Sequence, residues 1–459
     1  MIQRGLPGRS AVCVAMLAVA CAAPAPPQDG PAPSQEGPVA ARESAVAPAP
    51  LPVPVERGGA GVALAEPEEV GMDARKLALV DSLIAHAVLS GATPGAALAV
   101  GRHGRLVRLG GYGRLDWRNG FGPVTDSTIY DLASLSKVVG TTTAAMILVE
   151  EGKLDLDAPV SRYLDEWQGS GDKQRVTVRH LLTHSSGLPA YAPLWRELRG
   201  RDAYARRIGA MGLDYPPGSR TVYSDFGFIV LGFIIEELTG QTLDAFLDER
   251  VFDPLGMRDT GYNPRSWAAP VPAGMGGGES APEPEGTLPI LARVAPTEVD
   301  TIYRRTHVHG VVHDENAYAL GGVAGHAGLF SSARDLAVFA QMMLNGGEYG
   351  GVRVVDPATI ARFTRRAEGS GRALGWDKPS GTSSAGEHFS ARAFGHTGFT
   401  GTSVWIDPEY DVFVVLLTNR INPTRDNTKH AALRRAVHDA VILSITDMPV
   451  RKREGGEKR

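Results

Sequence analysis

The sequence predicts an α+β fold in which one sheet is built from both ends of the chain and a mainly helical region is inserted between them. Near the start of the body, a helical pattern precedes two strand-like runs, and near its end two strand-like runs precede a helical pattern. The residues between, about 153–345, contain many helical stretches broken by glycine- and proline-rich loops. Strands at both ends with helices between them therefore indicate this class.

The first helix is expected after Asp73, which can cap its N-terminus. Apolar residues then recur at helical spacing, at Leu77, Val80, Ile84 and Val88. Two runs rich in β-forming residues follow at 96–100 and 106–109, separated by the turn-like residues 102–104. This part of the chain is therefore expected to contribute one helix and two strands.

The second half repeats this arrangement after the helical region. Helices are expected at 228–238 and 333–344, and residues 270–289, rich in Gly, Pro and Glu, are expected to form a mobile surface loop. Strand-like runs at 402–406 and 412–417 flank a turn at 407–410. A final helix places apolar residues on one face, at Leu433, Ala436, Val437, Ala440 and Val441.

Composition excludes several classes of function. The 459 residues carry 47 Lys and Arg against 51 Asp and Glu, a net charge of −4, which is not the basic surface that a nucleic-acid partner needs. The two cysteines, Cys13 and Cys21, both lie at the front of the chain. The body therefore has no disulfide framework, thiolate zinc site, iron–sulfur cluster or catalytic cysteine.

The N-terminal residues 1–21 resemble an export signal. Arg4 and Arg9 precede a short apolar run at 11–20, which is too short to span a bilayer. Residues 18–21 resemble a bacterial lipobox, so Cys21 is the expected lipid attachment point, with a plain secretory signal as the alternative. A proline- and alanine-rich tether is expected at 22–63, the body at 64–447 and a charged tail at 448–459.

The first chemical motif is Ser134-x-x-Lys137, at the head of an apolar helix expected at 138–151. A spacing of three places both side chains on one helix face. A serine hydroxyl needs a base, and lysine can serve if the helix N-terminus and burial lower its pKa. Alone, the motif is weak and more typical of a solvated serine and lysine on a first helical turn.

Two further motifs give this pair a context. Tyr223-Ser224-Asp225 supplies a phenol, which beside a lysine can share a proton and protonate a leaving group. His396-Thr397-Gly398 precedes the strand-like run at 402–406, where an edge strand would face the serine and glycine would let a substrate backbone approach. The structural alternatives are a buried tyrosine and a turn histidine.

Together these motifs resemble those of the serine β-lactamase and penicillin-binding-protein superfamily. The closer likeness is to class C β-lactamase-like serine hydrolases, on residues 130–137, 179–189 and 325–331, and residues 312–318 resemble the penicillin-binding protein 4B-like subgroup. The resemblance covers the whole body. It implies a β-lactamase/DD-peptidase-like fold, an antiparallel sheet flanked by helices with an inserted helical domain, and an active site between the two.

The resemblance also implies a role for each matching residue. Ser134 is the acylated nucleophile, Lys137 its base and Tyr223 a proton-transfer partner. The backbone N–H groups of Ser134 and Phe399 form the oxyanion hole. The substrate-binding residues are Asp225, His396, Thr397 and Gly398. No cofactor is implied.

Two positions depart from the commoner family pattern. Asp225 stands where asparagine is more common, and His396 stands where lysine is usual. An aspartate repels a substrate carboxylate, and a histidine is mostly neutral at pH 7. Action on an ester or a D-amino-acid amide is therefore expected in preference to efficient β-lactam hydrolysis.

A histidine-rich stretch allows a competing interpretation. His307, His309 and His313 lie near Asp314 and Glu315, so a metal site is conceivable, although the serine motifs need no metal and none is expected. His326, between glycines, is expected to be a structural hydrogen-bonding residue.

Three functional hypotheses remain from the sequence. The first is an exported serine hydrolase of the bacterial cell envelope, acting through an acyl-enzyme on peptidoglycan peptides and touching the membrane only through its lipid anchor. The second is an esterase or weak β-lactamase acting on a small-molecule substrate. The third is a catalytically silent envelope-binding protein, which has no chemical need for Ser134, Lys137 and Tyr223 together.

Overall fold

The computed structural model describes residues 61–266, 290–381 and 383–453. The predicted signal, Cys21 and nearly all of the predicted tether lie outside the described residues, as do the loop at 270–289 and the end of the charged tail.

A five-stranded sheet joins the two ends of the body, as the sequence predicts. Its order is β10-β11-β12-β1-β2, and every neighbouring pair is antiparallel. The strands are β1 (Gly95–Arg102), β2 (Arg105–Gly113), β10 (Phe394–Thr397), β11 (Ser403–Asp407) and β12 (Val412–Thr418). The N-terminal hairpin meets the C-terminal strands where Leu98 pairs with Leu416, and β10 is an edge strand.

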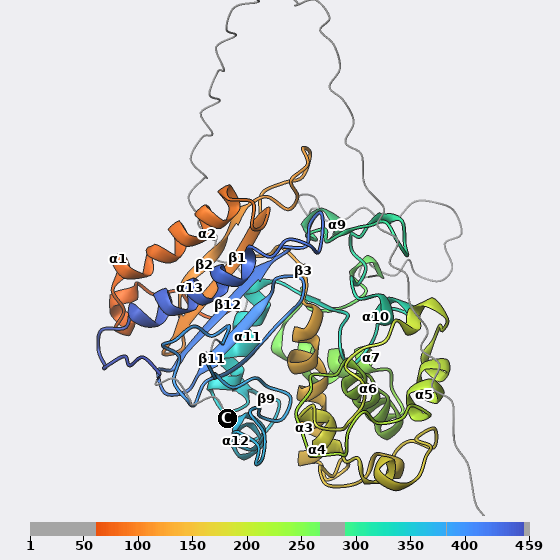
Figure 1. Cartoon of the computed structure of the whole chain (residues 1–459). Helices are drawn as coiled ribbons and strands as arrows, with labels where there is room; N and C mark the ends of the chain where they lie inside the picture. The colour runs from red at the N-terminus through yellow and green to blue at the C-terminus, as the bar shows by residue number, and fades with distance from the viewer. Residues whose placement is uncertain (1–60, 267–289, 382, 454–459) are drawn as a thin grey trace, which may run out of the picture. The chain divides into compact units, whose positions relative to one another are not determined.

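Helices cover both faces of this sheet (Figure 1). On one face lie α1 (Ala74–Leu77), α2 (Leu79–Leu89) and α13 (His430–Leu443), packed on alternate strand residues such as Leu98 and Val414. On the other lies α11 (Ala333–Leu344), packed on the intervening residues such as Ala97 and Val415. Because both faces are buried, the strands read as continuous apolar runs.

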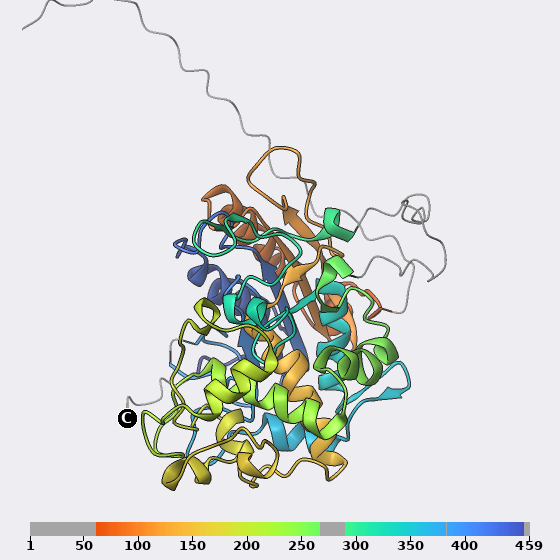
Figure 2. The same ribbon diagram turned by 90° about the vertical axis from the view of Figure 1, so that its right-hand side faces the viewer.

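The helical region lies to one side of the sheet, and Figure 2 views the molecule from that side. It is built around α6 (Asp225–Thr239), whose residues Phe226–Ile235 are all buried. Beside α11, the other α-helices in the described middle of the chain are α3 (Thr143–Glu150), α4 (Val178–Leu182), α5 (Arg201–Gly209), α7 (Leu243–Leu247), α8 (Asp253–Leu255), α9 (Ile290–Arg293), α10 (Glu315–Ala319) and α12 (Pro357–Thr364). A helix buried all round is typical of a protein core.

No single helix among the described residues is long and apolar enough to cross a membrane. One pair of consecutive helical segments, Asp225–Thr239 and Leu243–Leu255, is long and apolar enough when taken together, although the two segments are bent by 73° relative to each other.

A small three-stranded sheet connects the two regions. Its order is β3-β7-β4, with β3 at Tyr130–Asp131, β7 at Leu329–Ser331 and β4 at Gly261–Tyr262. Further two-stranded pairs are β5 (Val299–Asp300) with β6 (Thr306–His307), and β8 (Glu348–Tyr349) with β9 (Val352–Arg353). The pairing of β3 with β7 brings the chain before Ser134 beside the chain after His326.

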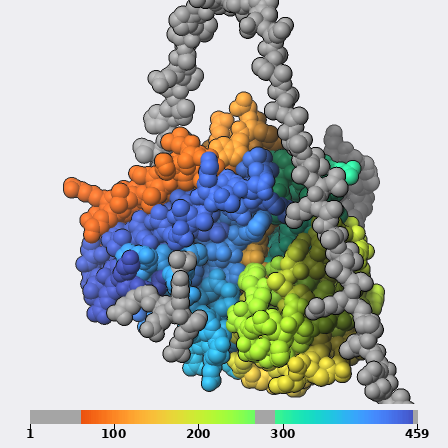
Figure 3. Space-filling view, viewed as in Figure 1, coloured from red at the N-terminus to blue at the C-terminus, as the bar shows by residue number. Residues whose placement is uncertain are grey.

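The space-filling view shows the sheet-forming ends, in orange and blue, beside the helical region in yellow and green (Figure 3).

The helix expected after Ser134 begins irregularly. Residues Ala133–Leu135 form a 3₁₀ turn (η2), and Lys137–Thr142 form a π-helix (η3) before the α-helical α3. The Thr143 hydroxyl donates to the carbonyl of Val138, five residues earlier, which matches the wider π turn. Such turns are frequent at functional sites.

Candidate active site

Ser134 sits on a strained turn that follows strand β3. Ala133, the residue before it, has a positive φ of 48°, which is unfavourable for a residue with a Cβ. The buried carboxylate of Asp131 holds the turn, because its Oδ1 accepts from the Ala133 N–H at 2.8 Å. Its Oδ2 accepts from the N–H of His313 at 2.6 Å, which ties the turn to the loop before α10.

Lys137 contacts Ser134 as the spacing of three predicts. The Lys137 Nζ lies 3.0 Å from Ser134 Oγ, and the lysine is fully buried. Nζ also donates to the carbonyl of His326 at 2.9 Å and lies 2.8 Å from Oδ1 of Asp225. Asp225, predicted to contact substrate, therefore forms an ion pair with the lysine.

This ion pair reverses the expected pKa shift of Lys137. Burial lowers the pKa of the ammonium, as the sequence analysis expects, but the charge of Asp225 at 2.8 Å and the Tyr223 hydroxyl raise it. The result is a pKa above the ordinary lysine value, so the lowered pKa on which the sequence analysis made a lysine base conditional is not found. Its physical reason is the carboxylate at a position where an amide is usual.

Tyr223 completes the polar group around the serine. Its hydroxyl lies beside Lys137 and Ser134, and although the residue is 37% exposed, desolvation at the hydroxyl outweighs the effect of Lys137 and raises the pKa of the phenol. The ring is stacked on the imidazole of His184, with centroids 4.4 Å apart. The structure thus brings Ser134, Lys137, Tyr223 and Asp225 together.

His184 is a site residue that sequence reasoning did not single out. It is buried, and its Nδ1 accepts from the backbone N–H of Ser224 at 3.1 Å. Its carbonyl accepts from the Val222 N–H at 2.8 Å, so it braces both sides of Tyr223. The sequence signal that could have identified His184 was the stretch 179–189, which was noted as part of the family resemblance.

His396 faces the same group from edge strand β10, with its ring 5.9 Å from that of Tyr223. Its Nδ1 lies 2.8 Å from the carbonyl of Thr397, which can only accept, so Nδ1 carries the proton. Its Nε2 is buried and has no hydrogen-bond partner among the described residues. Burial lowers the pKa of His396 to about 4, so the imidazole is neutral at pH 7, as expected.

Residues 398–402 are attached to the chain just before Ser134. The hydroxyl of Thr400 donates to the carbonyl of Asp131 at 2.7 Å, and that of Thr402 donates to the carbonyl of Leu132 at 2.9 Å. A Cβ on Gly398 would lie 2.3 Å from the same Leu132 oxygen. Gly398 is therefore required by the approach of the protein's own chain, whereas the prediction invoked a substrate backbone.

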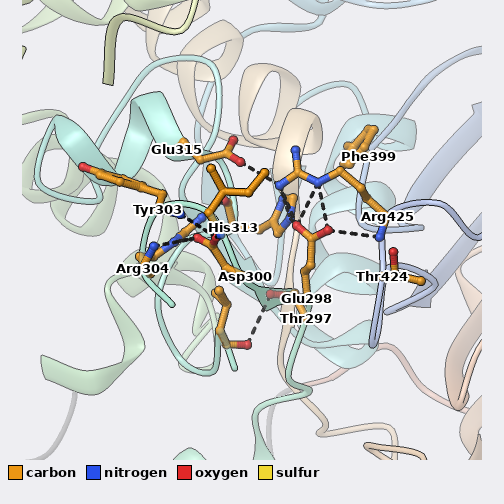
Figure 4. Close-up of polar contacts among 12 residues, drawn as sticks. Thr297, Glu298, Asp300, Tyr303, Arg304, His313, Glu315, Phe399, Thr424 and Arg425 are labelled. Atoms are coloured by element: carbon orange, nitrogen blue, oxygen red, sulfur yellow. Dashed lines mark hydrogen bonds and ion pairs between the residues drawn. The ribbon is translucent and has the colours of Figure 1, made fainter. Parts of the chain in front are cut away.

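Phe399 lies at the edge of the site, beside a charged network (Figure 4). Its ring is stacked on His313 at 5.8 Å. His313 Nε2 lies 2.9 Å from Glu298, and Arg425 pairs with both Glu298 and Glu315 at 2.5 and 2.6 Å. Burial of Glu298 is outweighed by its bonds to His313 and Arg425, so its pKa falls to about 2.

The histidine-rich stretch is divided among separate partners. His307 Nε2 contacts the carbonyl of Thr297, and His309 Nε2 contacts those of Leu291 and Val294. Within residues 61–266, 290–381 and 383–453, no group of three or more His, Cys, Asp or Glu is placed to hold a metal ion. His326 bonds Asp314 at 2.9 Å, which confirms its hydrogen-bonding role.

Comparison with known proteins agrees with the fold and the motifs. The Beta-lactamase family profile matches residues 80–439. The chain is 34% identical over 398 residues to a Salmonella agona (strain SL483) protein named “Putative D-alanyl-D-alanine carboxypeptidase”, covering 80% of this chain and 87% of that protein. A Salmonella typhimurium protein of the same name matches to the same extent.

Solved structures share the fold at lower identity. EstCE1, described as a hydrolase with promiscuous acyltransferase activity, superposes with a TM-score of 0.60 and 23% identity, covering 80% of this chain and 99% of that one. A penicillin-binding protein homolog from Caulobacter crescentus gives 0.59 and 24%, covering 82% and 99%. The chain therefore belongs to the Beta-lactamase family and is a serine hydrolase with the fold of the β-lactamases and penicillin-binding proteins.

Proposed function

We propose that this chain is a DD-carboxypeptidase-like hydrolase that cleaves the terminal D-amino acid from peptidoglycan peptides through an acyl-enzyme on Ser134. The observation that carries the chemistry is the 3.0 Å contact between Ser134 Oγ and the buried Lys137 Nζ. The name borne by relatives at 34% identity supports this substrate class.

Each site residue has a role in this reaction. Ser134 Oγ attacks the carbonyl carbon, and its proton passes into the group formed by Lys137 and Tyr223. The backbone N–H groups of Ser134 and Phe399 bind the oxyanion, whose charge develops only as the transition state is approached. Tyr223, whose hydroxyl lies beside Ser134 and Lys137, then donates a proton to the departing amine.

A cavity bounded by the charged network next to Phe399, and not by Ser134 or Tyr223 themselves, offers room for part of the peptide that precedes the cleaved bond. It has a volume of about 680 Å³, and its walls include Glu298, Glu315 and Arg425 of the network that supports Phe399. Tyr191 and Trp195 supply aromatic surface in the same wall. A cavity with both charged and aromatic walls suits a peptide with polar side chains.

Ester hydrolysis is the second candidate, and the neutral His396 favours it. With Nδ1 donating to Thr397 and a pKa of about 4, the ring presents no cation at pH 7. A neutral ester needs no such cation. The two candidates share the Ser134 acyl-enzyme and differ in the leaving group.

We further propose that the chain is exported to the bacterial cell envelope and anchored through Cys21. The charged, apolar and small-residue pattern of residues 1–21 supports this. Expression of the full chain and of Cys21→Ala, followed by membrane fractionation, tests it. The cysteine form should remain with membranes and the variant should be released, and equal release of both would contradict the anchor.

The acyl-enzyme is tested by covalent labelling. The full chain, Ser134→Ala and the control Ser127→Ala are incubated with a fluorescent penicillin and a fluorophosphonate, and adducts are mapped by mass spectrometry. An adduct on Ser134 is expected with at least one probe in the parent chain and the control. Labelling that persists in Ser134→Ala, or none with either probe, would contradict the proposal. Release of D-alanine from a D-Ala-D-Ala peptide, against hydrolysis of p-nitrophenyl esters, then separates peptidase from esterase.

A further inference from the structure

The contacts of Lys137 leave no free position for the proton of Ser134. The carbonyl of His326 and the carboxylate of Asp225 can only accept, so each takes one N–H of the lysine. The third position on Nζ faces the hydroxyls of Ser134 and Tyr223. In the ammonium form this position is also an N–H, and an ammonium has no lone pair to receive the serine proton.

A proton must therefore leave the ammonium as the serine attacks. Asp225 is the one carboxylate within ion-pair distance of Lys137 in the described part of the chain. It is about one-fifth exposed, so either of its protonation states can be solvated. An asparagine, which is more common at this position in the family, has no lone pair basic enough to take the proton.

The other charged or titratable groups near the lysine do not compete for this proton. His184 is buried beside Tyr223, and its Nδ1 already accepts from the Ser224 N–H. The Arg372 guanidinium, over the Tyr223 ring, is a cation. Asp314 is held by the ring of His326 and by the N-terminus of α10.

His396 is also a poor acceptor. Although its Nε2 carries the lone pair, burial lowers the pKa of the ring to about 4. Tyr223 retains its proton at neutral pH because burial raises the pKa of the phenol. Its hydroxyl proton is reserved for the leaving group.

We propose that Asp225 is the terminal proton acceptor of a relay that runs from Ser134 through Lys137. This inference rests on the proposed Ser134 acyl-enzyme. As the Oγ–carbon bond forms, the Ser134 O–H bond breaks and its proton moves to Nζ of Lys137. An N–H proton of Lys137 moves at the same time to Oδ1 of Asp225, so the lysine stays an ammonium and the aspartate becomes a neutral acid.

The relay is balanced when the leaving group departs. The carbonyl π electrons move to the oxyanion on attack and return as the carbon–nitrogen bond breaks. Tyr223 gives its proton to the departing amine and regains one from Lys137, which takes back the proton stored on Asp225. The net transfer is one proton from Ser134 to the leaving group, and all four residues return to their starting charges.

The relay and a simple lysine base predict opposite pH shifts. In the relay, activation of the serine needs Asp225 as proton acceptor, and the acid limb of the rate profile is the fall in rate at low pH where that activation fails. Asp225→Asn removes this acceptor, and Lys137 must then lose a proton to act, which moves the limb to higher pH. If neutral lysine were the base already, removing the carboxylate would lower the lysine pKa and move the limb to lower pH.

The test is the pH dependence of fluorophosphonate labelling of Ser134, followed by mass spectrometry on the full chain. Because fluoride needs no proton to leave, this rate isolates activation of the serine from proton donation by Tyr223. The variants are Asp225→Asn and Asp225→Glu, with Asp157→Asn, which removes a surface pair with Arg179, as the control. Thermal melting of each variant reports folding.

The expected result is labelling at pH 7 slowed about 100-fold or more in Asp225→Asn, with its acid limb moved more than one unit to higher pH. Asp225→Glu keeps a carboxylate acceptor and should leave the limb close to its position in the parent chain, which tests the relay even if the asparagine variant fails to fold. A limb that stays or moves down in Asp225→Asn, or rises in Asp225→Glu, would overturn the relay and leave the acyl-enzyme intact. Absence of labelling in the parent chain would overturn the proposed function, and the relay with it.

Discussion

The charge of a single side chain, His396, determines whether the pH profile of ester hydrolysis has an inflection that depends on this ring. Its ring is neutral down to a pKa of about 4, because burial disfavours the imidazolium. We therefore expect hydrolysis of a neutral ester to show no inflection between pH 6 and 7 that depends on His396. His396→Asn should change the size of kcat/KM without changing the shape of the profile, measured from pH 5 to 8. An inflection that is present in the parent chain and lost in the variant would show that the ring titrates there.

Gly398 is constrained by contact rather than by backbone conformation. A Cβ there would lie 2.1 Å from Thr402 Oγ1 and 2.3 Å from the carbonyl oxygen of Leu132, and real Cβ atoms do not approach so closely. We expect Gly398→Ala to separate residues 398–402 from the Ser134 turn, with a loss of about 1–3 kcal/mol of stability. Labelling of Ser134 should slow as a result. Thermal melting and labelling rates check this, with Gly212→Ala, where nothing lies within 4 Å and φ is not positive, as the control for an added methyl group.

At the scale of elements, the turn between β3 and η2 depends on one buried carboxylate. Asp131 accepts from the N–H groups of Ala133 and His313, and thereby holds the positive φ of Ala133. Asp131→Ala leaves two buried N–H groups without partners, which should cost about 2–5 kcal/mol of unfolding free energy. Chemical denaturation measures the loss. A variant as stable as the parent would show that other contacts hold the turn.

The same segment shows where sequence patterns stop being informative. The strands at 95–102 and 412–418 and the helix at 333–344 follow from apolar runs and periodicity, and they were predicted closely. The π turn at Lys137–Thr142 was not, because its apolar residues have the same pattern that a regular α-helix would have. The site motifs were found, but the ion pair between Lys137 and Asp225 was not predicted. Asp225 and Lys137 are 88 positions apart, and only the packing of α6 against η3 places them together.

At the scale of the whole molecule, distant contacts explain what remained beyond sequence reasoning. The network of Glu298, His313 and Arg425 joins three loops, and none of its members stood out except as part of a histidine-rich stretch. His184 was not identified for the same reason, because its role depends on the stacking of its ring on that of Tyr223, 39 positions away in the sequence. Fold class is accessible from composition and periodicity because these describe neighbours along the chain. Site electrostatics depend on neighbours in space.

Buried histidines also give the whole molecule a pH-dependent stability. Four fully buried rings, at His184, His396, His430 and His438, have pKa values lowered by burial, to about 4 for His396 and His438. Above pH 6.5 these histidines are neutral in both states and cost nothing. As pH falls below 6.5, the unfolded chain binds protons that the folded chain excludes, so stability is lost at about 1.4 kcal/mol per pH unit for each ring, down to its folded pKa.

A single substitution separates the effect of one buried histidine on stability from groups that act in the opposite direction. Asp335 is such a group, because burial raises its pKa to about 7 and its protonation stabilises the folded chain as pH falls. His438 lies in α13 with Nδ1 donating to the carbonyl of Ser384 at 2.7 Å, a bond that an asparagine amide can replace. His438→Asn should lower stability at pH 8 but flatten its decline between pH 6.5 and 4.5 by about 1.4 kcal/mol per unit. Urea unfolding at matched pH values measures both slopes, and all other groups cancel in their difference. Equal slopes in the two proteins would mean that His438 takes up a proton in the folded state, and the burial argument for this ring would fail.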